Sequence, residues 1–158
     1  MTASATRAPR SAGILLYRRH GDELQVLLVH PGGPFWARKD HGVWSIPKGE
    51  YGSSEDPLAA ARREFEEELG TAPPGGAAHD LGAIRQRAGK LVHAFGLEGD
   101  LDAGAITSNT CEIVWPPRSG RTITIPEVDR AEWFALGEAR ERILPAQAEL
   151  LDRLAERV

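Results

Sequence analysis

The chain has little of several things that mark particular classes of protein. It contains one cysteine, Cys111, so no intrachain disulfide can form and a reducing compartment is favoured. No apolar run approaches the roughly 18 residues that a membrane-spanning helix needs, and the N-terminal residues lack the apolar stretch of a signal peptide. We therefore expect a cytoplasmic protein without a membrane partner, whose residues 1–10 form a short mobile tail.

Basic residues are also in the minority. The 19 Lys and Arg residues face 23 Asp and Glu residues, which gives a formal net charge of −4. This balance argues against a broad basic surface for duplex nucleic acid, although a few local cations can still hold a small anionic ligand. The 158 residues, 41% hydrophobic and 27% charged, suit one globular domain, expected over residues 11–158.

The hydrophobic pattern predicts a mixed α/β fold. Residues 12–19 and 24–30 are apolar runs separated by His20-Gly21-Asp22-Glu23, a pattern typical of a β-hairpin. Further strands are expected over residues 43–47, 80–87, 90–98, 110–116, 122–126 and 131–136. An amphipathic helix is expected over residues 145–158. Strands grouped around one early and one late helix predict an α/β sandwich.

The early helix is delimited by Pro57, which suits a first-turn position, and by Gly70, which suits the C-terminal stop. Its candidate N-caps are Ser53, Ser54 and Asp56. One stripe at helical spacing is apolar and is predicted to face the core: Leu58, Ala61, Phe65 and Leu69. The helix is thus anchored by that stripe, and its neighbouring face is left for other contacts.

That neighbouring face is acidic. Glu64, Glu67 and Glu68 meet at the i, i+3 and i+4 spacing, and the last two lie near the helix C-terminus, where the macrodipole disfavours negative charge. A solvated acidic face with ordinary ion pairs is one interpretation. A site for a divalent cation is the other, because Mg²⁺ bound to these oxygens would offset both the repulsion between the carboxylates and their unfavourable position at the helix C-terminus.

The spacing from Gly49 carries more information than the helix face alone. It reads G-x5-E-x7-R-E-Φ-x-E-E-x-G, with Glu55, Arg63, Phe65 and Gly70 among the matching positions. This pattern resembles the Nudix box of the Nudix hydrolases. One position departs from it, since Thr71 stands where the family usually has an aliphatic residue. The resemblance implies a Nudix-type α/β/α sandwich with a mixed central sheet.

The resemblance also implies the metal ligands. In Nudix enzymes a water attacks one phosphorus of a diphosphate linked to another moiety, and divalent ions bridge the box carboxylates and the phosphates. Carried onto this chain, the ligands would be the side chains of Glu64, Glu67 and Glu68 and the carbonyl oxygen of Gly49. Glu55 would be an outer-shell ligand or bind a second metal ion. Mg²⁺ is the expected ion, with Mn²⁺ as its substitute.

Arg63 is expected to orient a carboxylate, and the general base is expected outside the box. The family often takes this base from a loop glutamate before the late aromatic strand. Here that position is matched by Glu127, six residues before Trp133, with Glu112 as the second candidate.

Substrate contacts are predicted from residues around the box. Lys48 resembles the Pro-Lys-Gly sequence before the box of hydrolases of dinucleoside and diphosphoinositol polyphosphates. Trp36 and Tyr51 are candidates to stack on a base, and Arg85 and Arg118 could line the same cleft.

Two marks of substrate class are missing. The tyrosine past the box of many dinucleoside polyphosphate hydrolases would fall at residues 87–89, where there is none. The proline of many ADP-ribose hydrolases is replaced by Gln86.

The first hypothesis is therefore Mg²⁺-dependent hydrolysis of a diphosphate linkage in nucleoside polyphosphates, with dinucleoside polyphosphates such as diadenosine tetraphosphate favoured. The enzymatic alternative is a pyrophosphohydrolase of nucleoside triphosphates or oxidised nucleotides. An alternative of another class is a non-catalytic, nucleotide-binding Nudix module, although the three box carboxylates are retained here. The attacked phosphorus, the number of metal ions and the oligomeric state stay open at this point.

Overall fold

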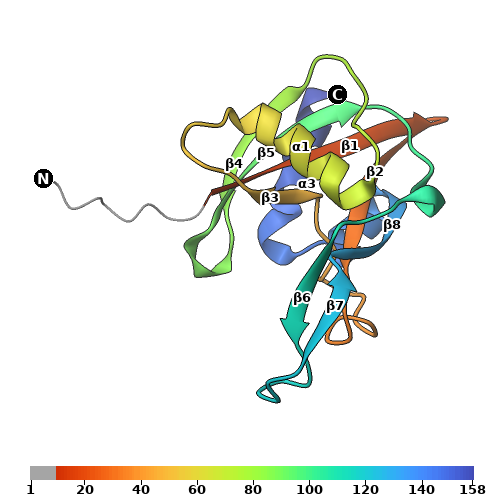
Figure 1. The fold of residues 1–158 in the computed structure, drawn as a ribbon. Helices are drawn as coiled ribbons and strands as arrows, with labels where there is room; N and C mark the ends of the chain where they lie inside the picture. Colours follow the sequence, from red (N-terminus) through yellow and green to blue (C-terminus); the bar gives the residue numbers. More distant parts are fainter. Residues whose placement is uncertain (1–9) are drawn as a thin grey trace, which may run out of the picture.

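The computed structural model describes residues 10–158, which form a central sheet with helices on both faces (Figure 1). The strands are β1 Arg10–His20, β2 Glu23–Pro31, β3 Lys48–Glu50, β4 His79–Arg85, β5 Leu91–Glu98, β6 Thr110–Val114, β7 Thr122–Pro126 and β8 Val128–Ala135. The α-helices are α1 Pro57–Leu69, α2 Leu136–Arg142 and α3 Ala148–Arg157. Short 3₁₀ turns occupy Arg87–Gly89, Ala103–Ala105 and Pro145–Gln147.

The main sheet is mixed, as predicted. Its strand order is β4-β5-β1-β2-β8, and β3 pairs with β1 beside this path. β1 and β5 are parallel, with Arg10 opposite Leu91, whereas the other pairs in this sheet are antiparallel. The expected hairpin between β1 and β2 is confirmed, and its turn uses Gly21 at a φ of 65°. β6 and β7 form a separate two-stranded sheet that projects from the body of the molecule (Figure 1).

Two hydrophobic clusters fill the two sides of the sheet. On one side Phe65 and Leu69 of α1 pack with Ile14 and Leu27. On the other side lie the apolar residues of α2 and α3, among them Leu150, with Leu15, Leu28, Trp44 and Ile143. The three layers confirm the α/β/α sandwich, with α1 and α3 on opposite faces of the sheet (Figure 1).

Helix α1 begins and ends where its sequence predicts. Of the three candidate N-caps, Asp56 caps the helix, accepting a hydrogen bond from the backbone N–H of Ala59 at 3.0 Å. Gly70 ends it in the left-handed conformation, φ 77°, and its N–H donates to the carbonyl of Glu66. The predicted stripe is buried except at Leu58, which is only partly covered.

The expected strand over residues 43–47 is wrong. This segment makes only isolated bridges, Ser45 with Val29 and Trp44 with Ile143. One residue of the segment pairs with β2 and the next pairs with the chain after α2, so neither pairing extends into a ladder. Pro47 also has no N–H with which to continue one. Regular pairing begins at Lys48, in β3.

The predicted tail, residues 1–10, lies outside the described residues except for Arg10, which begins β1. Within the described chain, every helix is too short or too polar to cross a lipid bilayer.

Candidate active site

The acidic face of α1 lies against β3. Glu64 and Glu68 are each only 8% exposed, whereas Glu67 remains exposed. A Cβ added to Gly49 would lie 2.0 Å from the Cδ of Glu64, so the backbone of β3 leaves room for this carboxylate only because residue 49 is glycine. The short strand and the helix therefore place the Gly49 backbone beside Glu64, two of the groups that the sequence proposes as metal ligands.

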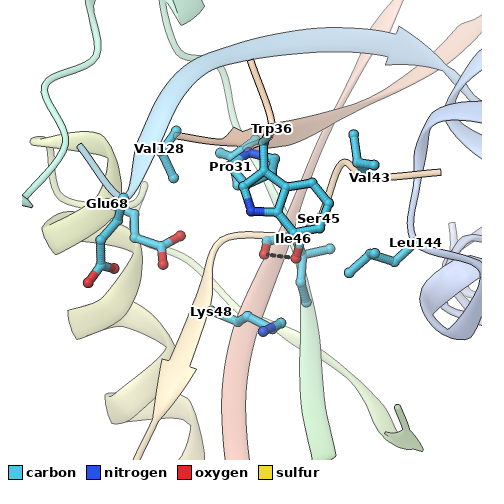
Figure 2. A pocket seen from close by; sticks show the side chains of 11 residues that line it. Pro31, Trp36, Val43, Ser45, Ile46, Lys48, Glu68, Val128 and Leu144 are labelled. Carbon is cyan, nitrogen blue, oxygen red and sulfur yellow. Dashed lines mark hydrogen bonds between the residues drawn. The ribbon is translucent and has the colours of Figure 1, made fainter. Parts of the chain in front are cut away.

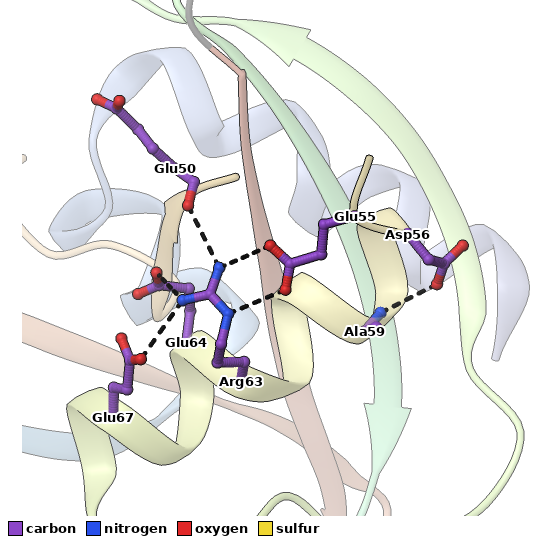
Figure 3. A network of polar contacts seen from close by, with 7 residues as sticks. All are labelled: Glu50, Glu55, Asp56, Ala59, Arg63, Glu64 and Glu67. Atoms are coloured by element: carbon purple, nitrogen blue, oxygen red, sulfur yellow. Dashed lines mark hydrogen bonds and ion pairs between the residues drawn. The ribbon is translucent and has the colours of Figure 1, made fainter. Parts of the chain in front are cut away.

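Arg63 joins four groups around this face (Figure 3). Its Nε and Nη2 donate to the two carboxylate oxygens of Glu55, both at 2.9 Å, in a bidentate pair. Its Nη1 donates to Glu64 at 2.9 Å and reaches Glu67 at 3.4 Å, and Nη2 also contacts the carbonyl oxygen of Glu50. These hydrogen bonds raise the pKa of Arg63, the pair with Glu55 most of all. The guanidinium orients carboxylates, as expected.

Glu68 is held in an unfavourable place for a negative charge. Burial first, and then the carboxylates of Glu127 and Glu64, raise the pKa of Glu68 to about 8, while Lys48 opposes the shift. Burial and the nearby ammonium of Lys90 lower the pKa of Lys48. The negative charge of the carboxylates at this site is thus only partly balanced by nearby basic side chains.

This donor set fits a divalent ion of the Mg²⁺ type. Carboxylate and carbonyl oxygens are the hard ligands that Mg²⁺ prefers. Burial, and then the neighbouring carboxylates, raise the pKa of Glu68, and a bound cation would offset this penalty on its negative charge. Within residues 10–158, no three His, Cys, Asp or Glu side chains converge as a preformed metal site. Glu64 and Glu67 both contact the guanidinium of Arg63 instead (Figure 3).

A pocket of about 230 Å³ adjoins the acidic face (Figure 2). It is lined by Val29, Pro31, Trp36, Val43, Ser45, Ile46, Lys48, Glu68, Glu127, Val128 and Leu144. Glu68 lies at one end and Val43 and Leu144 lie at the other, with the indole of Trp36 between them (Figure 2). The pocket therefore has a charged end beside the proposed ligands and an apolar end away from them.

The predicted site residues divide between this pocket and the rest of the surface. Lys48, Trp36 and Glu127 line it, and Glu127 is close enough to Glu68 to raise the pKa of that carboxyl. Glu112, the second candidate base, is exposed on β6 and does not line the pocket.

Three predicted substrate contacts also lie outside the pocket lining. Tyr51 packs against the cluster beneath α1. Arg85 donates to the carbonyl of Gly89 at 3.1 Å, and Arg118 lies in the exposed turn between β6 and β7 with a φ of 63°.

The loop that carries Trp36 is fixed by a buried histidine. His30 is 0% exposed; its Nδ1 lies 2.8 Å from a carboxylate oxygen of Asp129 and its Nε2 lies 2.6 Å from the carbonyl oxygen of Lys39. Each ring nitrogen therefore lies within hydrogen-bond distance of an oxygen from a different part of the chain. The backbone N–H of Gly32 also donates to the carbonyl of Glu127 at 3.0 Å. The loop is thereby tied to β8 and to the residue before it.

The sequence did not identify the residues that support the pocket floor. Gln147, fully buried, accepts from the N–H of Ile46 at 3.1 Å and donates to Ser45 Oγ and to Gln86. Ser45 and Leu144 line the pocket without belonging to any motif. The one available signal was a glutamine between the apolar positions before α3, and it does not reveal a partner 101 residues away.

Comparisons with known proteins agree with this geometry. The family model described as NUDIX domain matches residues 7–154. A comparison with curated proteins finds no significant match.

Among solved structures, the chain is similar to the NUDIX domain of Shewanella oneidensis NrtR complexed with ADP ribose. The TM-score is 0.65 at 19% identity, over 96% of this chain and 89% of that one. It is equally similar to a C. elegans Ap4A hydrolase binary complex, with a TM-score of 0.65 at 20% identity over 94% and 96% of the two chains.

A third likeness is to a structure of MutT from Aliivibrio salmonicida and Vibrio cholerae, with a TM-score of 0.55 at 12% identity over 94% and 96%. At these identities the likenesses concern the fold. The family match spans nearly the whole chain, and the box residues that it includes lie together on α1 and β3. The chain therefore belongs to the Nudix family of nucleotide pyrophosphohydrolases.

Proposed function

We propose that this enzyme hydrolyses a diphosphate linkage in nucleoside polyphosphates with Mg²⁺ as its cofactor, and that dinucleoside polyphosphates such as diadenosine tetraphosphate are its favoured substrates. The observation that carries the proposal is that charged, aromatic and aliphatic side chains line one and the same pocket. Lys48, Glu68 and Glu127 line it together with the indole of Trp36 and several aliphatic side chains. A nucleotide has the same division between phosphates and base.

Glu64, Glu67, Glu68 and the carbonyl of Gly49 would hold the metal. Bound Mg²⁺ neutralises charge on the phosphates and lowers the pKa of an attacking water. Glu55 can join this set only if it leaves Arg63, because both of its carboxylate oxygens accept from that guanidinium. We assign Arg63 the task of keeping the box carboxylates in position.

Glu127 is the proposed general base. Its carboxylate takes a proton from water as the water oxygen bonds to phosphorus, and the phosphorus–oxygen anhydride bond breaks to release the second phosphate group. Glu127 is exposed at the pocket mouth and electrostatically coupled to Glu68, so it is accessible to water and close to the reacting phosphates. The ammonium of Lys48 contacts the phosphate chain and balances part of its charge.

Nucleoside triphosphates remain the second candidate substrates, because a pocket of about 230 Å³ accepts one base as readily from a mononucleotide as from a dinucleotide. Of the similar structures, one is a complex with ADP ribose and another is an Ap4A hydrolase, and both of these compounds are built from nucleoside diphosphate units, which supports the first candidate.

The test is product analysis by anion-exchange chromatography. Diadenosine polyphosphates, nucleoside triphosphates, ADP-ribose and a diphosphoinositol polyphosphate are each incubated with the protein, with and without Mg²⁺. We expect Mg²⁺-dependent cleavage that is fastest for a diadenosine polyphosphate. Lack of turnover of every compound by folded protein would overturn the proposal, and faster cleavage of triphosphates would select the second candidate.

A further inference from the structure

The chain that leads into β3 is held by a side chain from near the end of the sequence. Ile46 stands two residues before Lys48, and within the described residues neither of its backbone groups pairs with a strand. Its N–H donates to Gln147 Oε1 at 3.1 Å, and its carbonyl oxygen accepts from Ser45 Oγ at 2.7 Å (Figure 2). That hydroxyl in turn accepts from Gln147 Nε2 at 3.0 Å. Gln147 therefore acts on both backbone groups of Ile46, on one directly and on the other through Ser45.

The amide of Gln147 is fully engaged in hydrogen bonds. A glutamine amide offers two N–H donors and one carbonyl oxygen. Its nitrogen donates to Ser45 Oγ and to Gln86 Oε1, the latter at 2.7 Å, and its oxygen accepts from Ile46. Because Gln147 is 0% exposed, water cannot replace a lost partner, and a buried polar group is costly to leave unpaired. Three segments of the chain thus hold this amide in one orientation.

Helix α3 itself gains little from the side chain of Gln147. The residue occupies the N-cap position of α3, where Ser, Thr, Asp or Asn would stabilise the helix by accepting a hydrogen bond from its first turn. Within residues 10–158 its side chain makes no capping hydrogen bond, and it contacts Ile46, 101 residues earlier, instead. A residue that departs from the local preference in favour of a distant contact is typical of a functional position.

This contact joins a well-anchored helix to a short strand. Helix α3 is fixed in the core by Leu150, Leu151 and Leu154, each 0% exposed. Strand β3 has three residues and pairs with β1. The tilt of so short a strand depends in part on the chain that precedes it, and that chain is held at Ile46 by Gln147.

The position of β3 matters because the strand lies against the proposed metal ligands. A Cβ added to Gly49 would lie 2.0 Å from the Cδ of Glu64, so the strand backbone and this carboxylate are packed closely together. The Gly49 carbonyl and the carboxylates of α1 must stay within bonding distance of one ion if they are to share it. Groups at a functional site have to be held within about 0.5 Å of their productive positions. A small displacement of β3 would therefore weaken metal binding.

We propose that Gln147 is a positioning residue, which holds Ile46 and thereby keeps Lys48 and the Gly49 carbonyl in place relative to the carboxylates of α1. The inference rests on the proposed function, because it requires these groups to share a divalent ion. Gln147 is fully buried and does not line the pocket, so it acts through the backbone of Ile46. It adds to the proposed site a residue that lies outside the segment from Gly49 to Gly70.

The first experiment measures metal affinity in the absence of substrate. Mn²⁺ is titrated into the metal-free protein, and the free ion is measured by electron paramagnetic resonance. Gln147→Met keeps the length of the side chain but loses all of its hydrogen bonds. We expect the Kd for Mn²⁺ to rise roughly 10-fold, since outer-shell partners of a metal cost 10- to 100-fold. An unchanged Kd in a folded Gln147→Met protein overturns the inference.

Leu154→Ala is the matched control for a general loss of stability. Leu154 lies on the same helix and packs against β5, where a Cβ added to Gly96 would lie 2.8 Å from its Cδ1. Urea denaturation should show that this variant is at least as destabilised as Gln147→Met, because it leaves a cavity in the core. Its Kd for Mn²⁺ should equal that of the parent. An equal rise in both variants would mean that metal affinity follows stability alone, and Gln147 would have no positioning role.

If Gln147→Met does not fold, Ser45→Ala takes its place. This variant removes the hydroxyl that links Gln147 to the carbonyl of Ile46 and leaves the bond to the Ile46 N–H. We expect the Kd for Mn²⁺ to rise roughly 2- to 10-fold, the contribution of one hydrogen bond. Ser45→Thr, which keeps the hydroxyl, should restore the parent value. A Ser45→Ala protein with the affinity of the parent contradicts the inference.

Turnover separates this inference from the proposed function. If the parent binds Mn²⁺ but cleaves no nucleoside polyphosphate, the proposed function fails, and the comparison of Kd values still decides the role of Gln147. If the parent cleaves one, Gln147→Met should need a higher Mg²⁺ concentration for its half-maximal rate, and an unchanged requirement counts against the inference. A parent that binds neither ion overturns both proposals.

Discussion

The segment from Gly49 to Gly70 and the apolar wall of the pocket differ in how strictly their residues are determined. In the segment, a side chain at position 49 would collide with Glu64, and the guanidinium of Arg63 contacts four other residues. In the wall, Val43 and Leu144 contribute aliphatic surface that other aliphatic residues could supply. The residues proposed for catalysis are therefore tightly constrained, whereas those of the pocket wall, which we expect to influence the choice of substrate, can be replaced by similar residues.

The strictest test of this difference is Glu68→Gln. It removes a proposed metal ligand while keeping the shape of the side chain, and we expect kcat to fall by at least about 100-fold, since even outer-shell partners of metals cost 10- to 100-fold. Glu66→Gln is the matched control, because Glu66 is exposed on the same helix. Circular dichroism should show both variants folded. A Glu68→Gln rate near that of the parent would remove Glu68 from the ligand set.

The pH dependence of stability gives a second test. The pKa of Glu68 is raised from 4.5 to about 8 in the folded protein, so the folded state binds more protons than the unfolded state between these values. The free energy of unfolding without metal should then fall as pH rises from about 4.5 to 8, by roughly 2 to 4 kcal/mol at about 1.4 kcal/mol per pKa unit.

Urea denaturation at several pH values, with EDTA, measures this slope. Glu68→Gln should flatten it, and Mg²⁺ should stabilise the parent at pH 8 more than the variant. A parent protein whose stability is level across this range would show that the carboxyl is not held at a raised pKa.

Arg63 is expected to matter through geometry as well as charge. Arg63→Lys keeps the positive charge but loses the fork that grips both oxygens of Glu55. We expect a 10- to 100-fold loss of kcat and a higher Mg²⁺ concentration at half-maximal activity. Arg62→Lys serves as the control, since Arg62 donates to the carbonyls of Pro74 and Gly76 and to no carboxylate. Unchanged Mg²⁺ response in Arg63→Lys would refute the positioning role.

We expect the smallest effects at Lys48 and Arg118, two basic residues outside the segment from Gly49 to Gly70. Lys48→Ala should raise KM for a dinucleoside tetraphosphate by about 10-fold, the scale of one moderately screened charge contact. Arg118→Ala should change it less than about 2-fold, because Arg118 lies in the turn between β6 and β7 and not in the pocket. Steady-state kinetics of the two variants side by side decides the matter. Equal effects would mean that the substrate extends to the hairpin.

The elements whose determinants are local were predictable from the sequence. The cap at Asp56, the stop at Gly70 and the hairpin at Gly21 each depend on residues within a few positions of one another. Residues 43–47 were mistaken for a strand because Val43, Trp44 and Ile46 are residue types that favour strands, but their partners lie in β2 and after α2. Local pattern does not contain that information.

The same distinction holds for the site. The box predicted which carboxylates gather on α1, but it did not predict that Glu64 and Glu68 would be buried, since burial depends on β3 lying against them. Tyr51, which was proposed to stack on a base, packs against the cluster beneath α1 and lies outside the pocket lining. Gln147 stands 101 residues from Ile46, so its support of the pocket floor is a property of the fold alone.

The two contacts of His30 connect parts of the chain that are far apart in the sequence. One end of the imidazole is fastened to Asp129, two residues beyond Glu127, and the other to the backbone of the loop that carries Trp36. The contacts of His30 therefore connect the loop that carries Trp36 to the strand that begins just after the proposed base, Glu127. We therefore expect the loop that carries Trp36 and the proposed base Glu127 to keep a fixed position relative to each other.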